Sequence, residues 1–207
     1  MSDIVIVDYG AGNLRSVQNA FKYLGLNAAI ISDPDSISLA SALVLPGQGS
    51  AAPAMALLKS NGMNLAIQEF VSSGKPFLGV CLGLQLLFDN SDEDDTDCLA
   101  IMPGSVRKFS NNQKVPQIGW NSVEIVRDHK IFEGISSNNF FYFANSYYVE
   151  PTNTNSILGS TNYGLKFCSV IAEENIVATQ FHPEKSGELG LRLYNNFIKH
   201  YLRGSAT

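Results

Sequence analysis

The chain has 207 residues, of which 45% are hydrophobic and 16% charged, and its formal net charge is -5. A chain of this length and apolar content can bury most of its nonpolar surface around one core, so we expect a single domain over residues 1–207. The acidic balance provides no basic surface, which argues against nucleic acid or an anionic membrane as the partner. We expect a small molecule or another protein instead.

The sequence carries no signal for export or membrane insertion. No apolar run approaches the ~20 residues that span a bilayer, and the first residues lack the basic region and cleavage site of a signal peptide. The three cysteines, Cys81, Cys98 and Cys168, lie far apart without a C-x-x-C pair. This spacing is typical of free thiols in a reducing compartment. We therefore expect a cytoplasmic protein with no metal and no cofactor.

The first half of the chain alternates short β-branched runs with amphipathic stretches. Strands are expected at Asp3–Asp8, Ala28–Ser32, Ala42–Leu45 and Phe77–Val80, and a helix is expected at Leu14–Leu24. Nearly continuous apolar strands in a βαβ order indicate a parallel sheet that is covered by helices on both faces. The predicted fold class is therefore α/β, with an open and mostly parallel sheet.

The loops that follow the strands are the expected ligand site, because such sheets bind ligands in the crevice at the carboxyl ends of their strands. Four segments lie there: Tyr9–Asn13, Pro46–Gly49, Cys81–Gln85 and His182–Glu184.

The second half of the chain has a different pattern. Alternating or aromatic runs at Val123–Val126, Phe140–Val149 and Ile176–Phe181 predict an antiparallel extension of the sheet. A closing helix is expected from about Glu188 to Arg203, where apolar residues recur at helical spacing. The acidic run Ser91–Asp97 is expected to be a solvated loop.

Cys81 stands in the context of a nucleophile elbow. It follows an apolar strand, precedes the expected helical run Leu84–Phe88, and has Gly79 and Gly83 two positions away on either side. Glycine at both positions avoids collisions in a sharp turn, and the start of a helix behind the sulfur would favour the reactive thiolate. The alternative is an ordinary buried thiol, but this context favours the nucleophile.

A cysteine nucleophile needs a base within hydrogen-bond reach, and the chain has three histidines. His129 lies in a polar loop and His200 near the end of the last helix. His182 ends an apolar strand and precedes Pro183, which biases it to an extended conformation in which residues two apart project to the same side. His182 and Glu184 would thus face one crevice together, with the carboxylate orienting the imidazole.

These motifs resemble a known family. The segments Leu45–Gly49 (L-P-G-Q-G), Gly79–Gln85 (G-V-C-L-G-L-Q) and Gln180–Ser186 (Q-F-H-P-E-K-S) are similar to those of class I, triad-type glutamine amidotransferases. Within that class, three further segments resemble the glutaminase subunits of imidazole glycerol phosphate synthases. They are Asp8–Asn13 (D-Y-G-A-G-N), Val115–Asn121 (V-P-Q-I-G-W-N) and Phe141–Tyr148 (F-Y-F-A-N-S-Y-Y). The likeness covers nearly the whole chain.

The resemblance implies a mechanism. Cys81 would attack the side-chain amide of glutamine, His182 would transfer the thiol proton to the departing ammonia, and Glu184 would orient His182. The oxyanion donors would be the N–H of Leu82 and the peptide at Gly47–Gln48. The family's oxyanion and substrate-binding positions correspond here to Gly47, Gln48, Gly49, Leu82, Gln85, Ser146 and Tyr147.

The resemblance also implies a protein partner. In relatives a barrel-shaped cyclase receives the ammonia and forms imidazole glycerol phosphate and an aminoimidazole carboxamide ribotide, so a heterodimer is expected. Trp120, Asn121 and Lys185 correspond to family positions at that interface. Core packing is the alternative for a lone tryptophan.

Three residues depart from the family's usual pattern. Gln117 and Asn145 stand where histidine is usual, and Gln48 where a small apolar residue is usual. A paralogous subunit that supplies ammonia for amidine formation in surface-sugar biosynthesis is therefore a second candidate. A catalytically silent regulatory subunit is a third. A cysteine hydrolase acting on peptides is disfavoured by Gln85 and the P-G-Q-G strand, which suit a small amide.

Overall fold

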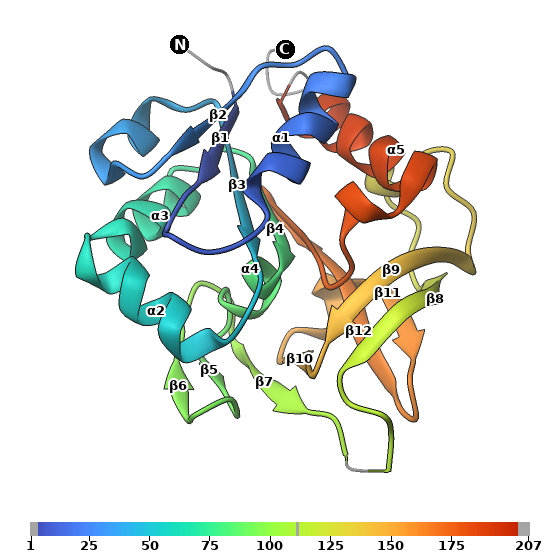
Figure 1. Cartoon of the computed structure of the whole chain (residues 1–207). Coiled ribbons are helices and arrows are strands. Elements are labelled where there is room, and N and C mark those ends of the chain that lie inside the picture. The colour runs from blue at the N-terminus through green and yellow to red at the C-terminus, as the bar shows by residue number, and fades with distance from the viewer. Residues whose placement is uncertain (1–3, 111, 203–207) are drawn as a thin grey trace.

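The computed structural model describes residues 4–110 and 112–202, whose strands form one continuous sheet with helices on both faces (Figure 1). The parallel part runs in the order β2, β1, β3, β4, β13. These strands are β1 (Ile4–Val7), β2 (Ala28–Ile31), β3 (Ala42–Gly47), β4 (Phe77–Cys81) and β13 (Ile176–Thr179). The predicted parallel half is confirmed.

The sheet continues beyond β13 through strands from the second half of the chain, which pair mainly antiparallel. They are β7 (Gly104–Lys108), β8 (Gln117–Ile125), β9 (Asn139–Asn145), β10 (Tyr147–Pro151), β11 (Ile157–Asn162) and β12 (Lys166–Glu173), with the short β5 (Asn90–Ser91) and β6 (Thr96–Asp97) at one edge. The predicted antiparallel extension is confirmed, with β5 against β7 as a parallel exception. The assignment of Ile176–Phe181 to that extension was wrong, because β13 is buried on both faces and pairs parallel with β4, and only its other edge pairs antiparallel, with β12.

Two layers of helices cover the two faces of the parallel strands (Figure 1). Helices α2 (Ala51–Ser60) and α3 (Met63–Ser72) pack on one face, and α1 (Leu14–Tyr23) and α5 (Gly187–Phe197) pack on the other. Side chains alternate between the faces of a strand, so Val5 belongs to the first core and Ile4 to the second. Both residues are buried, which explains why these strands are apolar throughout.

Short helical turns complete the chain. They are α4 (Leu82–Gln85), the 3₁₀ turns η1 (Pro34–Leu39), η2 (Lys130–Phe132), η3 (Thr154–Ser156) and η4 (Pro183–Lys185), and the π turn η5 (Ile198–Leu202).

Several predicted elements differ in extent from the observed ones; β8, for example, begins at Gln117 and not at Val123. The aromatic run Phe140–Val149 is interrupted at Ser146, because β9 pairs with β8 whereas β10 pairs with β7 and β12. The closing helix begins at Gly187 and leaves α-helical geometry after Phe197, where the π turn η5 starts. Its expected last residue, Arg203, lies outside the described residues.

The expectation of a solvated loop at 91–97 is wrong. This segment forms the β5–β6 hairpin, in which Ser91 and Thr96 are buried. Glu93 Oε2 accepts a hydrogen bond of 2.7 Å from the N–H of Ala51, at the start of α2. Ser50, the N-cap of α2, makes no side-chain cap, so a carboxylate distant in sequence satisfies one unpaired N–H there.

Within the described ranges, no helix combines the length and the apolar character needed to cross a membrane.

Candidate active site

Cys81 lies on a strained turn between β4 and α4. Its φ of 56° falls in the left-handed region, which is uncommon for any residue with a side chain. A Cβ added to Gly79 would lie 2.8 Å from the carbonyl oxygen of Gly83, and one added to Gly83 would lie 1.8 Å from the carbonyl oxygen of Leu45. Both positions therefore require glycine, as expected of a nucleophile elbow, although Gly83 is constrained by the neighbouring strand β3.

The helix behind Cys81 is shorter than predicted, because α4 ends at Gln85 and does not continue to Phe88. The carbonyl oxygens of Leu86, Leu87 and Phe88 accept hydrogen bonds from N–H groups of residues 99–102 instead. These three side chains are fully buried, so tertiary packing ends the helix after one turn.

His182 and Glu184 meet at the end of β13. His182 has the predicted extended backbone, with a φ of -96°, whereas Glu184 belongs to the 3₁₀ turn η4 and not to extended chain. The turn brings His182 Nδ1 within 2.8 Å of Glu184 Oε1, and the exposed fractions of the two side chains are 3% and 2%. Ser186 fixes this turn, because its hydroxyl donates to the carbonyl oxygen of His182 at 2.6 Å.

The imidazole of His182 also interacts with the side chain of Cys81, since both residues line one pocket. Burial lowers the pKa of His182, but hydrogen bonds and charge interactions with Cys81 and Glu184 outweigh it and raise the pKa from 6.5 to about 10. An imidazolium is therefore favoured at neutral pH, paired with a carboxylate on one side and a sulfur on the other. This arrangement suits a thiolate nucleophile with a proton donor beside it.

Tyr194, on α5, is a residue of this site that the sequence analysis did not identify. Its hydroxyl donates to Glu184 Oε2 at 3.3 Å, so the second oxygen of the carboxylate is also held. Tyr194 is fully buried, and burial raises its pKa well above 10, which keeps the hydroxyl protonated as a donor. In the sequence it looks like one more apolar residue of an amphipathic helix.

Gln180 is a second residue that the sequence analysis missed. Its side chain is fully buried, and its Nε2 donates to Cys81 Sγ at 3.8 Å. Gln85 Nε2 donates to Gln180 Oε1 and to the carbonyl oxygen of Tyr147, both at 3.1 Å. A chain of amides thus links the wall of the crevice to the sulfur.

A pocket of about 310 Å³ opens at Cys81, which is a suitable size for an amino acid. It brings together the following predicted residues: Gln48, Gly49, Cys81, Leu82, Gln85, Ser146, Tyr147, His182 and Lys185. Glu184 lies behind His182 and does not line the pocket. Gly47 also lies outside the lining, where an added Cβ would be 2.6 Å from Leu82 Cβ and 2.9 Å from the hydroxyl of Tyr9.

Glu93 lines the same pocket and was not predicted. The carboxylate that accepts from the N–H of Ala51 therefore also faces the crevice. A carboxylate in a pocket of this size can pair with the ammonium group of an amino acid. Its place within an acidic run hid it from sequence reasoning.

Beyond the pocket, the β8–β9 hairpin has an apolar outer face. Trp120 is 57% exposed and makes an edge-to-face contact with Tyr142, and Ile118 and Phe140 are exposed beside them. Lys185 Nζ lies 5.8 Å from the centre of the Tyr142 ring. Trp120 is thus not a core residue. Lys185 lies between this face and the pocket, because it contacts Tyr142 and also lines the pocket.

Asn121 has different surroundings from Trp120, its neighbour on β8. Its Nδ2 donates to the carbonyl oxygen of Asn162 at 3.0 Å, and its Oδ1 accepts from the N–H of Ser122. Successive residues of a strand point to opposite faces, so Asn121 lies on the other side of the hairpin.

The unusual residues Gln117 and Asn145 are direct cross-strand neighbours on β8 and β9. Both are buried, at 3% and 4% exposure, and among the described residues neither side-chain oxygen has a hydrogen-bond partner. Asn145 Nδ2 donates to the carbonyl oxygen of Tyr147, which also binds Gln85. The two substitutions therefore form a single polar pair beside the pocket.

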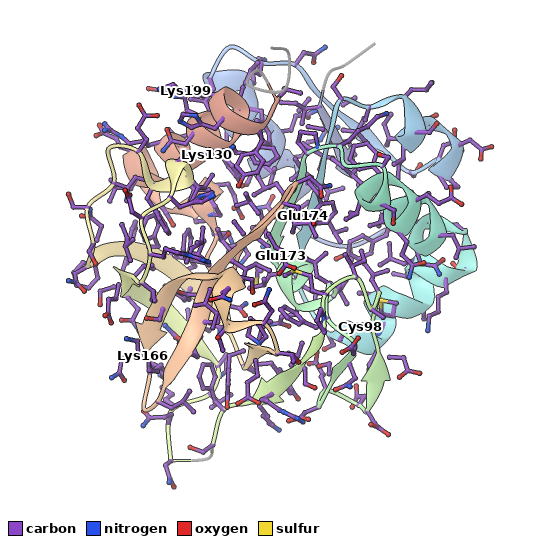
Figure 2. The ribbon with its side chains drawn as sticks, turned by 180° about the vertical axis from the view of Figure 1, so that it is seen from behind. Cys98, Lys130, Lys166, Glu173, Glu174 and Lys199 are labelled. Carbon is purple, nitrogen blue, oxygen red and sulfur yellow. The ribbon has the colours of Figure 1, made fainter. Side chains whose placement is uncertain are left out.

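The other cysteines lie away from this pocket. Cys98 lies near α2 (Figure 2), where burial, together with Asp97 and Glu93, raises its pKa to about 11. Burial raises the pKa of Cys168 to about 12. Neither thiol is favoured as a thiolate at neutral pH.

The other two histidines are engaged elsewhere in the fold. His129 Nδ1 accepts from the N–H of Ile131 at 3.2 Å, and His200 Nε2 bonds Glu133 Oε2 at 2.5 Å.

Known proteins resemble the chain over nearly its whole length. A family model described as glutamine amidotransferase class-I matches residues 5–201. The imidazole glycerol phosphate synthase subunit HisH of Dehalococcoides mccartyi strain CBDB1 is 46% identical over 197 residues, which cover 95% of this chain and 96% of that protein. The HisH subunit of Methanosarcina barkeri strain Fusaro is 46% identical over 202 residues, covering 96% and 98%.

A crystal structure of a glutamine amidotransferase has the same fold, with a TM-score of 0.76 at 20% identity over 97% of this chain and 98% of that chain. The predicted α/β class is therefore confirmed, and so is the family resemblance noted in the sequence motifs. The chain belongs to the class I glutamine amidotransferase family, whose model spans all but its ends.

Proposed function

We propose that this protein is the glutaminase subunit of an imidazole glycerol phosphate synthase. It hydrolyses L-glutamine to glutamate and ammonia and passes the ammonia to a cyclase subunit. The observation that carries the proposal is the convergence of Cys81 with the His182–Glu184 pair at a pocket of amino-acid size. The relatives named as HisH subunits support the pathway.

The reaction proceeds by covalent catalysis. The Cys81 thiolate attacks the carboxamide carbon of glutamine, and the carbonyl π electrons move to oxygen to give a tetrahedral intermediate. Collapse of the intermediate breaks the C–N bond, and the His182 imidazolium protonates the departing nitrogen, which leaves as ammonia. Water, deprotonated by His182, then attacks the thioester, and glutamate leaves as Cys81 regains its sulfur electrons. Glu184 holds the ring for both steps.

The substrate is held along the walls of the pocket. The N–H of Leu82, at the start of α4, and the Gly47–Gln48 peptide donate to the oxyanion, and loss of one such donor costs about 100- to 1000-fold in rate. Gln85, Ser146 and Tyr147 position the glutamine, with Gly49 beside them. The carboxylate of Glu93 pairs with the substrate's ammonium group, which supplies selectivity for an amino acid.

The cyclase subunit docks on the apolar outer face of β8–β9 to form a heterodimer. The exposed Trp120 and the neighbouring Tyr142 are suited to anchor such an interface. Lys185 connects it with the pocket, and Asn121 supports the hairpin from behind. Ammonia released under this cover avoids protonation in bulk water. The cyclase then completes the lyase reaction, which yields imidazole glycerol phosphate and aminoimidazole carboxamide ribotide in histidine biosynthesis, in the cytoplasm.

The test is glutamate release from glutamine, measured with the chain alone and after addition of purified cyclase subunit and its nucleotide substrate. We expect release that rises with the cyclase and that falls in Trp120→Ala through weaker complex formation. Tyr23→Ala is the matched control, because Tyr23 is an exposed aromatic residue on α1. Absence of release in a formed complex would leave only a regulatory subunit.

A second candidate is favoured by the Gln117–Asn145 pair, which replaces two usual histidines beside the pocket. In this role the same glutaminase would deliver ammonia for amidine formation in surface-sugar biosynthesis. Adding the two kinds of cyclase-like protein in parallel separates the candidates. Stimulation of glutamine hydrolysis by the histidine-pathway cyclase supports the first proposal, and stimulation only by the other supports the second.

A further inference from the structure

A directed chain of hydrogen bonds runs from the wall of the pocket to the nucleophile. It begins at the carbonyl oxygen of Tyr147, passes through the amides of Gln85 and Gln180, and ends at Cys81 Sγ. The proposed reaction assigns no role to Gln180.

The direction of this chain is fixed by its first member. A backbone carbonyl can only accept, so the group of Gln85 that faces Tyr147 must be its NH₂. The same NH₂ faces Gln180, which must therefore present its carbonyl oxygen and turn its own NH₂ toward the sulfur of Cys81. The opposite amide orientation would place two acceptors together at Tyr147. The NH₂ group of Gln180 therefore faces the sulfur whether Cys81 is a thiol or a thiolate.

Burial strengthens the hydrogen bond from Gln180 to the sulfur. Gln180 is fully buried and Gln85 is 5% exposed, so water does not compete for either amide. The backbone of Gln180 is also fixed, because its N–H donates to the carbonyl oxygen of Ser169 at 2.9 Å. An N–H donor held in this way favours the anionic form of an acceptor over the neutral form. At Cys81 the anionic form is the thiolate.

We propose that Gln180 stabilises the thiolate of Cys81 and couples it to Gln85, so that contacts made at Gln85 change the reactivity of the sulfur. Gln180 shares the sulfur with His182, which supplies the proton, while Gln180 supplies a neutral donor that cannot be deprotonated. The carbonyl oxygen of Ala144, to which the thiol donates at 3.9 Å, faces the sulfur as an acceptor and favours the neutral form, so the Gln180 donor acts against it. The part concerning glutamine turnover rests on the proposed function, whereas the reactivity of the thiol does not.

The test measures the rate at which iodoacetamide alkylates Cys81 as a function of pH, with peptide mass spectrometry to separate Cys81 from the other cysteines. In Gln180→Met, which keeps the length of the side chain but removes the donor, we expect the rate at pH 7 to fall about tenfold. The midpoint of the pH profile should move up by about one unit. Gln180→Glu should move the midpoint further, because a carboxylate repels the thiolate.

The matched control is Asn196→Leu. Asn196 is also a buried amide, and it donates to the carbonyl oxygens of Ile131 and Glu133 away from the pocket. This variant should lose comparable stability and leave the alkylation profile of Cys81 unchanged. An unchanged profile in Gln180→Met would overturn the proposal. Gln180→Leu, which also removes the donor without adding a charge, gives the same decision if the first variant does not fold.

Coupling through Gln85 is tested in the same assay. Gln85→Met should shift the midpoint in the same direction as Gln180→Met, although among the described residues Gln85 has no hydrogen bond to the sulfur. The double variant should shift it by less than the sum of the two single shifts. Additive shifts would overturn the coupling. If the wild-type chain released no glutamate with any cyclase, the proposed function would fail, while the alkylation profiles would still decide the role of Gln180.

Discussion

His182 Nδ1 and Glu184 Oε1 lie 2.8 Å apart, with both side chains almost completely withdrawn from water. This contact, together with that to Cys81, raises the pKa of His182 from 6.5 to about 10. Because the folded-state pKa lies above the unfolded value, the ion pair contributes its full stability below pH 6.5. The contribution is lost as the pH rises through about 10.

We predict that Glu184→Gln lowers the pKa of His182 and reduces kcat for glutamine hydrolysis at least tenfold, because the amide cannot stabilise an imidazolium. The alkaline limb of the pH–rate profile should move to lower pH. NMR titration of the imidazole measures the pKa directly. Glu188→Gln, at the start of α5, is the control. An unchanged His182 pKa in Glu184→Gln would show that the carboxylate does not set it.

Removal of the Tyr194 hydroxyl should weaken the support of Glu184. For Tyr194→Phe we predict a loss of about 1 kcal/mol in the free energy of unfolding and a severalfold lower kcat with little change in KM. Tyr163→Phe is the control. Its hydroxyl also donates a hydrogen bond, to the carbonyl oxygen of Lys114, and neither residue lines the pocket. Denaturation and steady-state kinetics check both variants. Equal kcat in the two would contradict a role for Tyr194 in the site.

Glu93→Gln should raise KM for glutamine about tenfold and leave kcat nearly unchanged, because a charge-assisted contact to the substrate's ammonium is lost. The amide oxygen can still accept from the N–H of Ala51, so stability should fall by no more than about 1 kcal/mol. Asp95→Asn, at an exposed position in the same hairpin, controls for the change in charge. A lower kcat with constant KM in Glu93→Gln would argue against substrate binding.

Gly83→Ala should be among the most destabilising single changes in the chain, because the added Cβ would lie 1.8 Å from the carbonyl oxygen of Leu45. We predict a loss of about 3 kcal/mol or more, with loss of glutaminase activity. Leu65→Ala, on the exposed side of α3, should have little effect on either. Chemical denaturation gives the comparison, and a Gly83→Ala protein of normal stability would refute the close approach of α4 to β3.

The elbow and the parallel half of the sheet could be predicted because each depends on local chemistry. Only glycine fits at positions 79 and 83, and only buried parallel strands tolerate apolar side chains on both faces. The meeting of His182 with Glu184 was also expected. The extended geometry inferred for Glu184 was wrong, since Pro183 opens a 3₁₀ turn that achieves the same contact.

The missed residues act through contacts that are distant in sequence. Glu93 reaches α2 from a hairpin in an acidic run, Gln180 looks like an ordinary strand residue, and Tyr194 matches the apolar pattern of its helix. Local patterns do not encode these contacts, which depend on how β13, α5 and the hairpin pack together. The early end of α4 also results from contacts distant from it in sequence, because N–H groups of residues 99–102 donate hydrogen bonds to the carbonyl oxygens of Leu86–Phe88.

The most direct test of the account is the site of covalent labelling by an electrophilic glutamine analogue, located by peptide mass spectrometry. We predict one label per chain, on Cys81, with none on Cys98 or Cys168, and no label in Cys81→Ala. Labelling of another residue, or of the Cys81→Ala variant to the same extent, would contradict the assignment of Cys81 as the nucleophile.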